Sequence, residues 1–204
     1  MRDNFPLKIR VVGRACQHLL LILALFLSGC ASDRFDLSKT TAVPQGEGVV
    51  FGRVKVTSDG KIENLSRAFG KGTFSIVILP DTSSEGITIP LKKEGYFFWH
   101  LQSGGYTIAG FQLGSSLDYI RGRIFAHFDV TRDKVMYIGT LTMVFDRGGK
   151  TRKLMEALGI LDAKWRYVMF VEDEFDSAEQ EFRKRFPEIR EDITKSLMVM
   201  EKTR

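Results

Sequence analysis

From residue 48 to about residue 146, the chain alternates short apolar runs with clusters of turn-forming residues. In the first run, 48–56, Val50, Val54 and Val56 alternate with other residue types, and Asp59-Gly60 follows directly. Apolar residues at every second position predict a strand with one buried face, and Asp-Gly is typical of a tight turn. Several such runs at short spacing predict a mainly β domain.

Three further runs support this prediction. Residues 73–79 are almost continuously apolar and stop before Pro80, and residues 165–171 predict another strand late in the chain. Residues 86–91 predict a short strand that lies at a sheet edge, because Pro90 lacks the amide hydrogen that a central strand needs.

The most informative block spans residues 95–108 and has the sequence GYFFWHLQSGGYTI. Phe97, Trp99 and Leu101 fall on one face of a strand, Gly104-Gly105 supplies a turn, and a second strand follows. This pattern resembles the carboxypeptidase-regulatory-like, or prealbumin-like, β-sandwich family. The resemblance covers about residues 47–146, and it implies an opening strand at 48–56 and a closing hairpin formed by 124–130 and 134–141. Its motifs are structural and imply no activity.

The C-terminal region has a helical pattern instead. Eight apolar residues recur at an average step of about 3.6, which predicts an amphipathic helix with one buried stripe: Phe175, Ala178, Phe182, Phe186, Ile189, Ile193, Leu197 and Met200. Pro187 lies inside this run, where it costs about 3 kcal/mol in an unbroken helix. The sequence therefore predicts a kinked helix, or two abutting helices with one shared buried face.

The first 29 residues have the composition of an export signal. A basic segment with Arg2, Lys8, Arg10 and Arg14 precedes nine apolar residues at 19–27. Nine helical residues span about 14 Å, which is less than half of a bilayer core of about 30 Å. The segment is therefore expected to be a cleaved signal and not a permanent membrane span.

The residues Leu27-Ser28-Gly29-Cys30 resemble the lipobox of bacterial lipoproteins. The resemblance implies cleavage between Gly29 and Cys30, and attachment of acyl chains to Cys30 as a membrane anchor. Ala31 follows the cysteine where an Asp would mark retention in the inner membrane, so we expect outer-membrane placement facing the periplasm.

These patterns divide the chain into four parts. They are a signal peptide at 1–29, the lipidated cysteine with a flexible tether at 30–46, a β-sandwich at 47–172 and a C-terminal helical segment at 173–204. Within the tether, Phe35 and Leu37 are candidates for contact with the domain.

Charge and cysteine content limit the function further. Removal of residues 1–29 takes away four of 30 Lys and Arg and one of 25 Asp and Glu, which leaves 26 against 24. We expect no nucleic-acid partner, because such binding requires a concentrated basic face. Cys16 leaves with the signal and Cys30 is the anchor, so the folded domain has no free thiol.

Several short motifs are candidate sites of chemistry. Gly149-Lys150-Thr151 lacks the earlier glycine of a phosphate-binding loop, since Val144 occupies that position, and a basic turn is the better interpretation. His100 and His127 stand alone in strands, opposite the apolar sets. The acidic run at 172–176 is expected to be a solvated connection between strand and helix. We therefore expect no catalytic residue, metal or cofactor.

Tyr96, Phe98, Trp165 and Tyr167 have two interpretations. They form an exposed platform for a glycan, or they fill a second core under the C-terminal helix. The sequence favours a non-catalytic, lipid-anchored module of the cell envelope that binds another protein. The alternatives are a glycan-binding lipoprotein, with peptidoglycan or polysaccharide as ligand, and a hydrolase.

Overall fold

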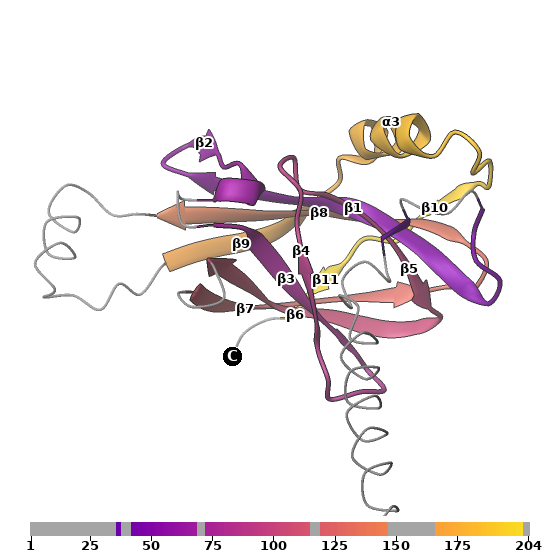
Figure 1. The fold of residues 1–204 in the computed structure, drawn as a ribbon, viewed down its shortest axis with the longest axis horizontal. Helices are drawn as coiled ribbons and strands as arrows, with labels where there is room; N and C mark the ends of the chain where they lie inside the picture. The colour runs from indigo at the N-terminus through magenta and orange to yellow at the C-terminus, as the bar shows by residue number, and fades with distance from the viewer. Residues whose placement is uncertain (1–35, 38–41, 69–71, 115–118, 147–165, 202–204) are drawn as a thin grey trace, which may run out of the picture. The chain divides into compact units, whose positions relative to one another are not determined.

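The alternation of apolar and polar residues places eleven strands in two sheets (Figure 1). A computed structural model describes residues 36–37, 42–68, 72–114, 119–146 and 166–201. The signal segment, Gly29 and Cys30, Trp165 and the basic turn at 147–153 lie outside the described residues.

The first sheet is built around two long strands that run parallel to each other, β1 (Glu47–Ser58) and β8 (Val135–Asp146). On the free side of β1 lie β5 (Tyr96–Gln102) and the short β2 (Lys61–Ile62), both antiparallel to it. The free side of β8 carries β9 (Arg166–Glu172), which is antiparallel, and β10 (Ile193–Lys195), which is parallel. The predicted turn between β1 and β2 is confirmed, with φ of 52° at Asp59 and 76° at Gly60.

The second sheet contains five antiparallel strands in the order β11-β7-β6-β3-β4. Their bounds are β11 (Val199–Met200), β7 (Tyr119–Val130), β6 (Gly104–Gly114), β3 (Phe74–Pro80) and β4 (Ile87–Pro90). A short 3-10 helix, η3 (Leu65–Arg67), precedes β3. The prediction that Pro90 marks an edge strand is confirmed, because β4 ends the sheet.

Two hydrophobic cores hold these layers. The main core lies between the sheets and contains the inward residues Phe97, Trp99 and Leu101 of β5. The second core lies on the outer face of the first sheet, under helix α3 (Phe175–Arg185), where Phe51 stacks on Phe182 with ring centroids 4.6 Å apart. The predicted mainly β sandwich with a C-terminal amphipathic helix is therefore confirmed.

The predicted extent of that helix is wrong. It ends at Arg185, and residues from the expected stripe continue as a loop and then as β10 and β11. Pro187 disfavours helical geometry at the preceding residue, and Phe186 has φ −128° and ψ 64°. The Arg183 guanidinium then donates to the carbonyls of Ile189, at 2.7 Å, and Glu191, at 3.0 Å, which holds the loop.

The expected closing hairpin of 124–130 with 134–141 is also wrong, and the two strands of the 95–108 block do not pair with each other either. β5 and β6 follow each other directly, but β5 pairs with β1 in the first sheet and β6 with β3 and β7 in the second. In the same way, β7 and the next strand, β8, belong to different sheets. Each of these connections therefore crosses from one sheet to the other. The apolar faces of the strands on both sides of the crossing point into the main core between the sheets.

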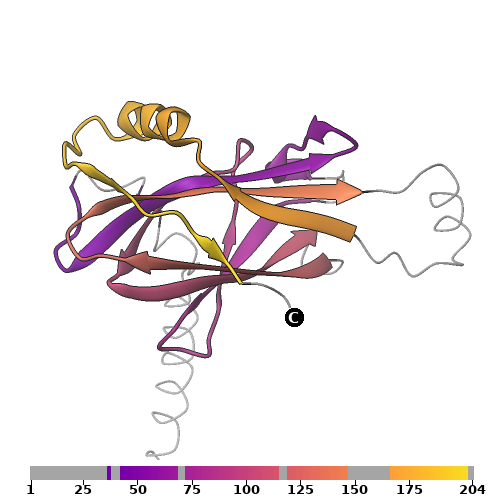
Figure 2. The same ribbon diagram turned by 180° about the vertical axis from the view of Figure 1, so that it is seen from behind.

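The C-terminal segment joins the two layers (Figure 2). β10 pairs with β8, and the amides of Ser196 and Met198 donate to the carbonyls of Tyr137 and Ile138. β11 then pairs with β7 in the other sheet. The last described residues thus connect the edge of one sheet with the edge of the other.

Removal of a large side chain from the second core tests its contribution to stability. Phe182 is fully buried against Phe51 and Phe98. We expect Phe182→Ala to lower the free energy of unfolding by about 3 kcal/mol, as measured by urea denaturation. The control is Lys184→Ala on the exposed side of the same helix, for which a change below about 0.5 kcal/mol is expected. Equal effects of the two changes would contradict the second core.

Candidate functional site

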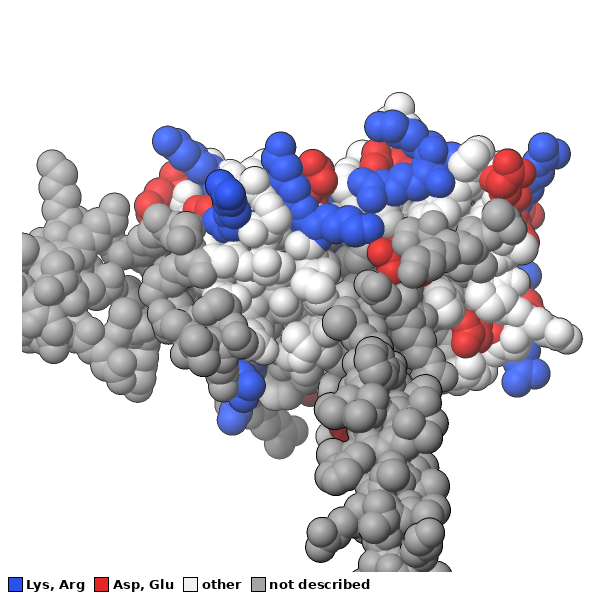
Figure 3. Space-filling model, viewed as in Figure 1, with Lys and Arg blue, Asp and Glu red and all other residues white. Residues whose placement is uncertain are grey.

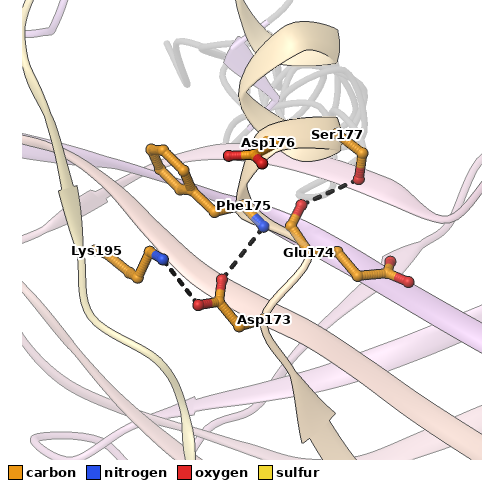
Figure 4. Close-up of a pocket in the computed structure, with 6 residues that line it drawn as sticks. All are labelled: Asp173, Glu174, Phe175, Asp176, Ser177 and Lys195. Atoms are coloured by element: carbon orange, nitrogen blue, oxygen red, sulfur yellow. Dashed lines mark hydrogen bonds and ion pairs between the residues drawn. The ribbon is translucent and has the colours of Figure 1, made fainter.

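The connection between β9 and α3 forms a polar hollow of about 330 Å³ beside β10 (Figure 4). It is lined by the residues that end the strand and begin the helix, together with one lysine of β10: Asp173, Glu174, Phe175, Asp176, Ser177 and Lys195. Asp173 accepts a hydrogen bond from the Phe175 amide at 3.2 Å, and the Lys195 ammonium lies 2.8 Å from the same carboxylate. The acidic run is thus a strand-to-helix connection, as predicted.

A second set of charges lies on the outer face of the first sheet, next to this hollow. The Lys55 ammonium lies 2.6 Å from Glu174 and 3.3 Å from Glu172, and Arg53 lies 3.8 Å from the other oxygen of Glu174. Thr142 donates its hydroxyl hydrogen to Glu172. The amide of Glu174 also donates to the Tyr137 hydroxyl at 2.8 Å. These contacts hold the end of β9 against β1 and β8.

The pKa values follow from these contacts. The Glu174 hydrogen bond raises the pKa of Lys55, against an opposing effect of burial. The Thr142 hydrogen bond, assisted by Lys55, lowers the pKa of Glu172. Likewise, the hydrogen bond between Lys195 and Asp173 lowers the pKa of Asp173 and raises the pKa of Lys195. Because Glu172, Asp173 and Glu174 each have a cationic partner, we assign this cluster a structural role as the joint of the helix.

Of the four candidate aromatic residues, the three that the structure describes do not share one surface. Tyr96 and Phe98 stack on the outer face of the first sheet, and Phe98 is only 5% exposed because Phe182 and Phe186 cover it. Tyr167 instead is partly buried and packs against the main core, on Phe111 and Phe145. Its hydroxyl accepts from the Arg123 amide and donates to the Arg123 carbonyl, both at 3.0 Å, which links β9 to β7.

The two histidines lie apart in different sheets. His100 Nδ1 lies 2.5 Å from Glu47, which also accepts from Gln102 at 2.8 Å. His127 lies 3.7 Å from Asp129 and contacts the Thr107 hydroxyl at 3.5 Å. Both alternate with buried residues, as expected from the sequence. Among the residues that the structure describes, no group of three or more His, Cys, Asp or Glu is arranged to hold a metal ion.

Sequence reasoning did not find a trough of about 530 Å³ on the outer face of the second sheet. Thr88, Val77, Gly110 and Arg123 form one row across four strands there, in register. Gly110 leaves the row open at its centre, and Arg121 lies beside it on β7. The only sequence signal for this trough is a glycine within a strand, and that signal alone indicates a bulge or a close backbone approach.

A further contact joins the N-terminal segment to the sandwich. Asp36 forms an isolated antiparallel bridge with Trp99 of β5, and its carboxylate lies 3.1 Å from the Lys92 ammonium. Leu37 is fully buried in the second core with Phe51 and Phe98. Contact of Leu37 with the domain was expected, and Phe35 lies outside the described residues.

Comparison of the chain with known protein families and with curated proteins found no match. Within the described ranges, no helix is long and apolar enough to cross a bilayer.

The charge cluster predicts a pH dependence of stability. The pKa of Glu172 in the folded protein lies below its ordinary value of 4.5, so its contribution is complete above about pH 4.5 and is lost as the pH falls through the lowered value. Glu172→Gln should lower the free energy of unfolding at pH 7 by less than about 1 kcal/mol, because solvent screens a partly exposed pair.

Urea denaturation at pH 7 and at about pH 3 measures this effect, and the difference between parent and variant should shrink at the lower pH. The matched control is Glu188→Gln in the exposed loop after α3. An equal difference at both pH values would contradict the assigned ion pair.

Proposed function

We propose that this chain is an exported lipoprotein whose β-sandwich is held close to a membrane by acyl chains on Cys30. There it acts as a non-catalytic module that binds another protein of the cell envelope. The single observation that best supports this proposal is the contact of Asp36 and Leu37 with the sandwich, only a few residues after the lipobox.

The position of this contact limits how far the domain can lie from its anchor. Six steps of the chain separate Cys30 from Asp36. At about 3.5 Å per residue, a fully extended segment of that length spans about 20 Å. A free tether as far as residue 46 would span more than twice that distance. With outer-membrane placement facing the periplasm, the module is therefore restricted to a layer next to the lipid.

A surface for a protein partner lies on the half of the first sheet that α3 leaves open. Val144, Val168 and Phe170 are 39%, 66% and 40% exposed there, on the adjacent strands β8 and β9. Adjacent exposed apolar side chains of this kind mark sites of protein contact. On the face seen in Figure 3, Lys and Arg side chains are interspersed with Asp and Glu, which suits a protein partner better than nucleic acid.

The glycan-binding alternative is less well supported. It depended on Tyr96, Phe98, Trp165 and Tyr167 lying together and exposed, but Phe98 is covered and Tyr167 packs against the main core. No specific observation supports the hydrolase alternative.

Replacement of the anchor residue tests the proposal. We expect Cys30→Ser to abolish the need for detergent to extract the protein from membranes, since the acyl chains have no other attachment point. The measurement is partition between detergent and aqueous phases, together with the mass of the purified chain. The matched control is Cys16→Ser, which changes the other cysteine and should leave acylation and extraction unchanged. Detergent-dependent extraction of Cys30→Ser, with an unchanged cleavage site, would refute the anchor.

A further inference from the structure

Three of the four lateral edges of the two sheets are covered or interrupted. β11 covers part of the edge at β7, and the isolated bridge at Asp36 covers part of the edge at β5. The edge at β4 is four residues long and ends in Pro90. Proteins commonly use such devices to stop open edges from pairing with other chains.

Among the described residues, the fourth edge, at β9, carries no paired strand and no proline, although β11 approaches it from the second sheet. β9 pairs with β8 on one side, and no other strand among the described residues pairs with its other side. Between Arg166 and Glu172 its sequence is Tyr-Val-Met-Phe-Val, five residues without a charge, a proline or a glycine. An open, apolar edge of this length favours addition of another strand.

Met169 lies at the centre of the five apolar and aromatic residues 167–171 of β9. In an antiparallel pair of two copies centred there, Val168 lies opposite Phe170 of the partner copy, and Tyr167 opposite Val171. Aromatic and β-branched residues in direct cross-strand pairs stabilise a sheet.

We propose that the partner of this surface is a second copy of the same chain, joined through antiparallel pairing of the two β9 edges. The contact is isologous, with a two-fold axis at Met169, so it closes at two copies and forms one continuous sheet. Val168 and Phe170 of each copy then cover each other, next to Val144.

The symmetry of this pairing agrees with attachment at one membrane, and this point rests on the proposed function. A two-fold axis between antiparallel strands of one sheet stands perpendicular to the sheet, so the outer faces of both copies lie on the same side. Leu37 packs on that outer face, under α3. The two copies of Leu37 therefore lie on the same side of the joined sheet.

A lysine on the exposed edge tests the interface without disturbing the core. We expect sedimentation of the full chain in detergent to show a dimer, and Val168→Lys to weaken its association about tenfold or more. The matched control is Val199→Lys, since Val199 is also 66% exposed and lies on the short edge strand β11. A monomeric parent protein, or equal weakening by both changes, would overturn the proposal.

The register has a sharper test. Two tagged copies, one with Val168→Cys and the other with Phe170→Cys, both in a Cys16→Ser background, should form a disulfide-linked heterodimer on mild oxidation. Copies that both carry Val168→Cys should crosslink far less, because the two positions lie diagonally in this register. Equal crosslinking of both combinations would contradict it, and the parent chain without an added cysteine controls for Cys30.

This test separates the dimer from the anchor. If Cys30→Ser is soluble without detergent and still dimeric, the dimer forms independently of the acyl chains. If Val168→Lys becomes monomeric and still requires detergent for extraction, the anchor is independent of the dimer. If Val168→Lys no longer required detergent for extraction, the surface around Val168 would contribute to membrane attachment. Its assignment to the pairing of two copies would then be wrong.

Discussion

The two central strands of the first sheet are apolar on both faces, so both faces require cover. In β1, Val50 and Val54 point to the main core, and Val49 and Phe51 point to the second core. The second sheet covers the inner face. Helix α3 and Leu37 cover the outer face over part of its length, and the remaining part carries Val144, Val168 and Phe170. Burial of this apolar area stabilises the fold, and the uncovered part is where a partner gains most from binding.

This requirement also explains the path of the C-terminal region. β9 and β10 pair with the same side of β8, and α3 lies between them in the chain. The helix packs over the outer face of the first sheet, where it forms the second core. The charge cluster of Lys55, Glu172 and Glu174 fixes the point where the chain leaves the sheet. β11 then reaches the other sheet, so that the last segment holds both layers.

The sequence predicted most strands well, because alternation and turn residues are local signals. The turn at Asp59-Gly60 and the edge strand with Pro90 are examples. It did not predict that β5 and β6 belong to different sheets, because alternation shows which side chains are buried and not which strand pairs with which.

The length of the helix was overestimated for a related reason. Phe186 and Ile189 are buried as the periodic stripe requires, but they lie beyond the end of α3, in the loop that follows it. Periodicity shows that these side chains face a core. A helix, a loop or a strand can each bury them at the same place. The cluster around Lys55 joins residues more than 100 positions apart, so only the tertiary structure reveals it.

The proposed acyl anchor on Cys30 holds the sandwich next to a lipid surface by a very short link. Neutron reflectometry of the full-length protein in a supported bilayer measures the distance between the lipid headgroups and the protein layer. With six chain steps between Cys30 and Asp36, we expect the protein layer to begin within about 20 Å of the headgroups. A protein layer separated from the headgroups by a larger gap of solvent, or none retained on the bilayer, would contradict it.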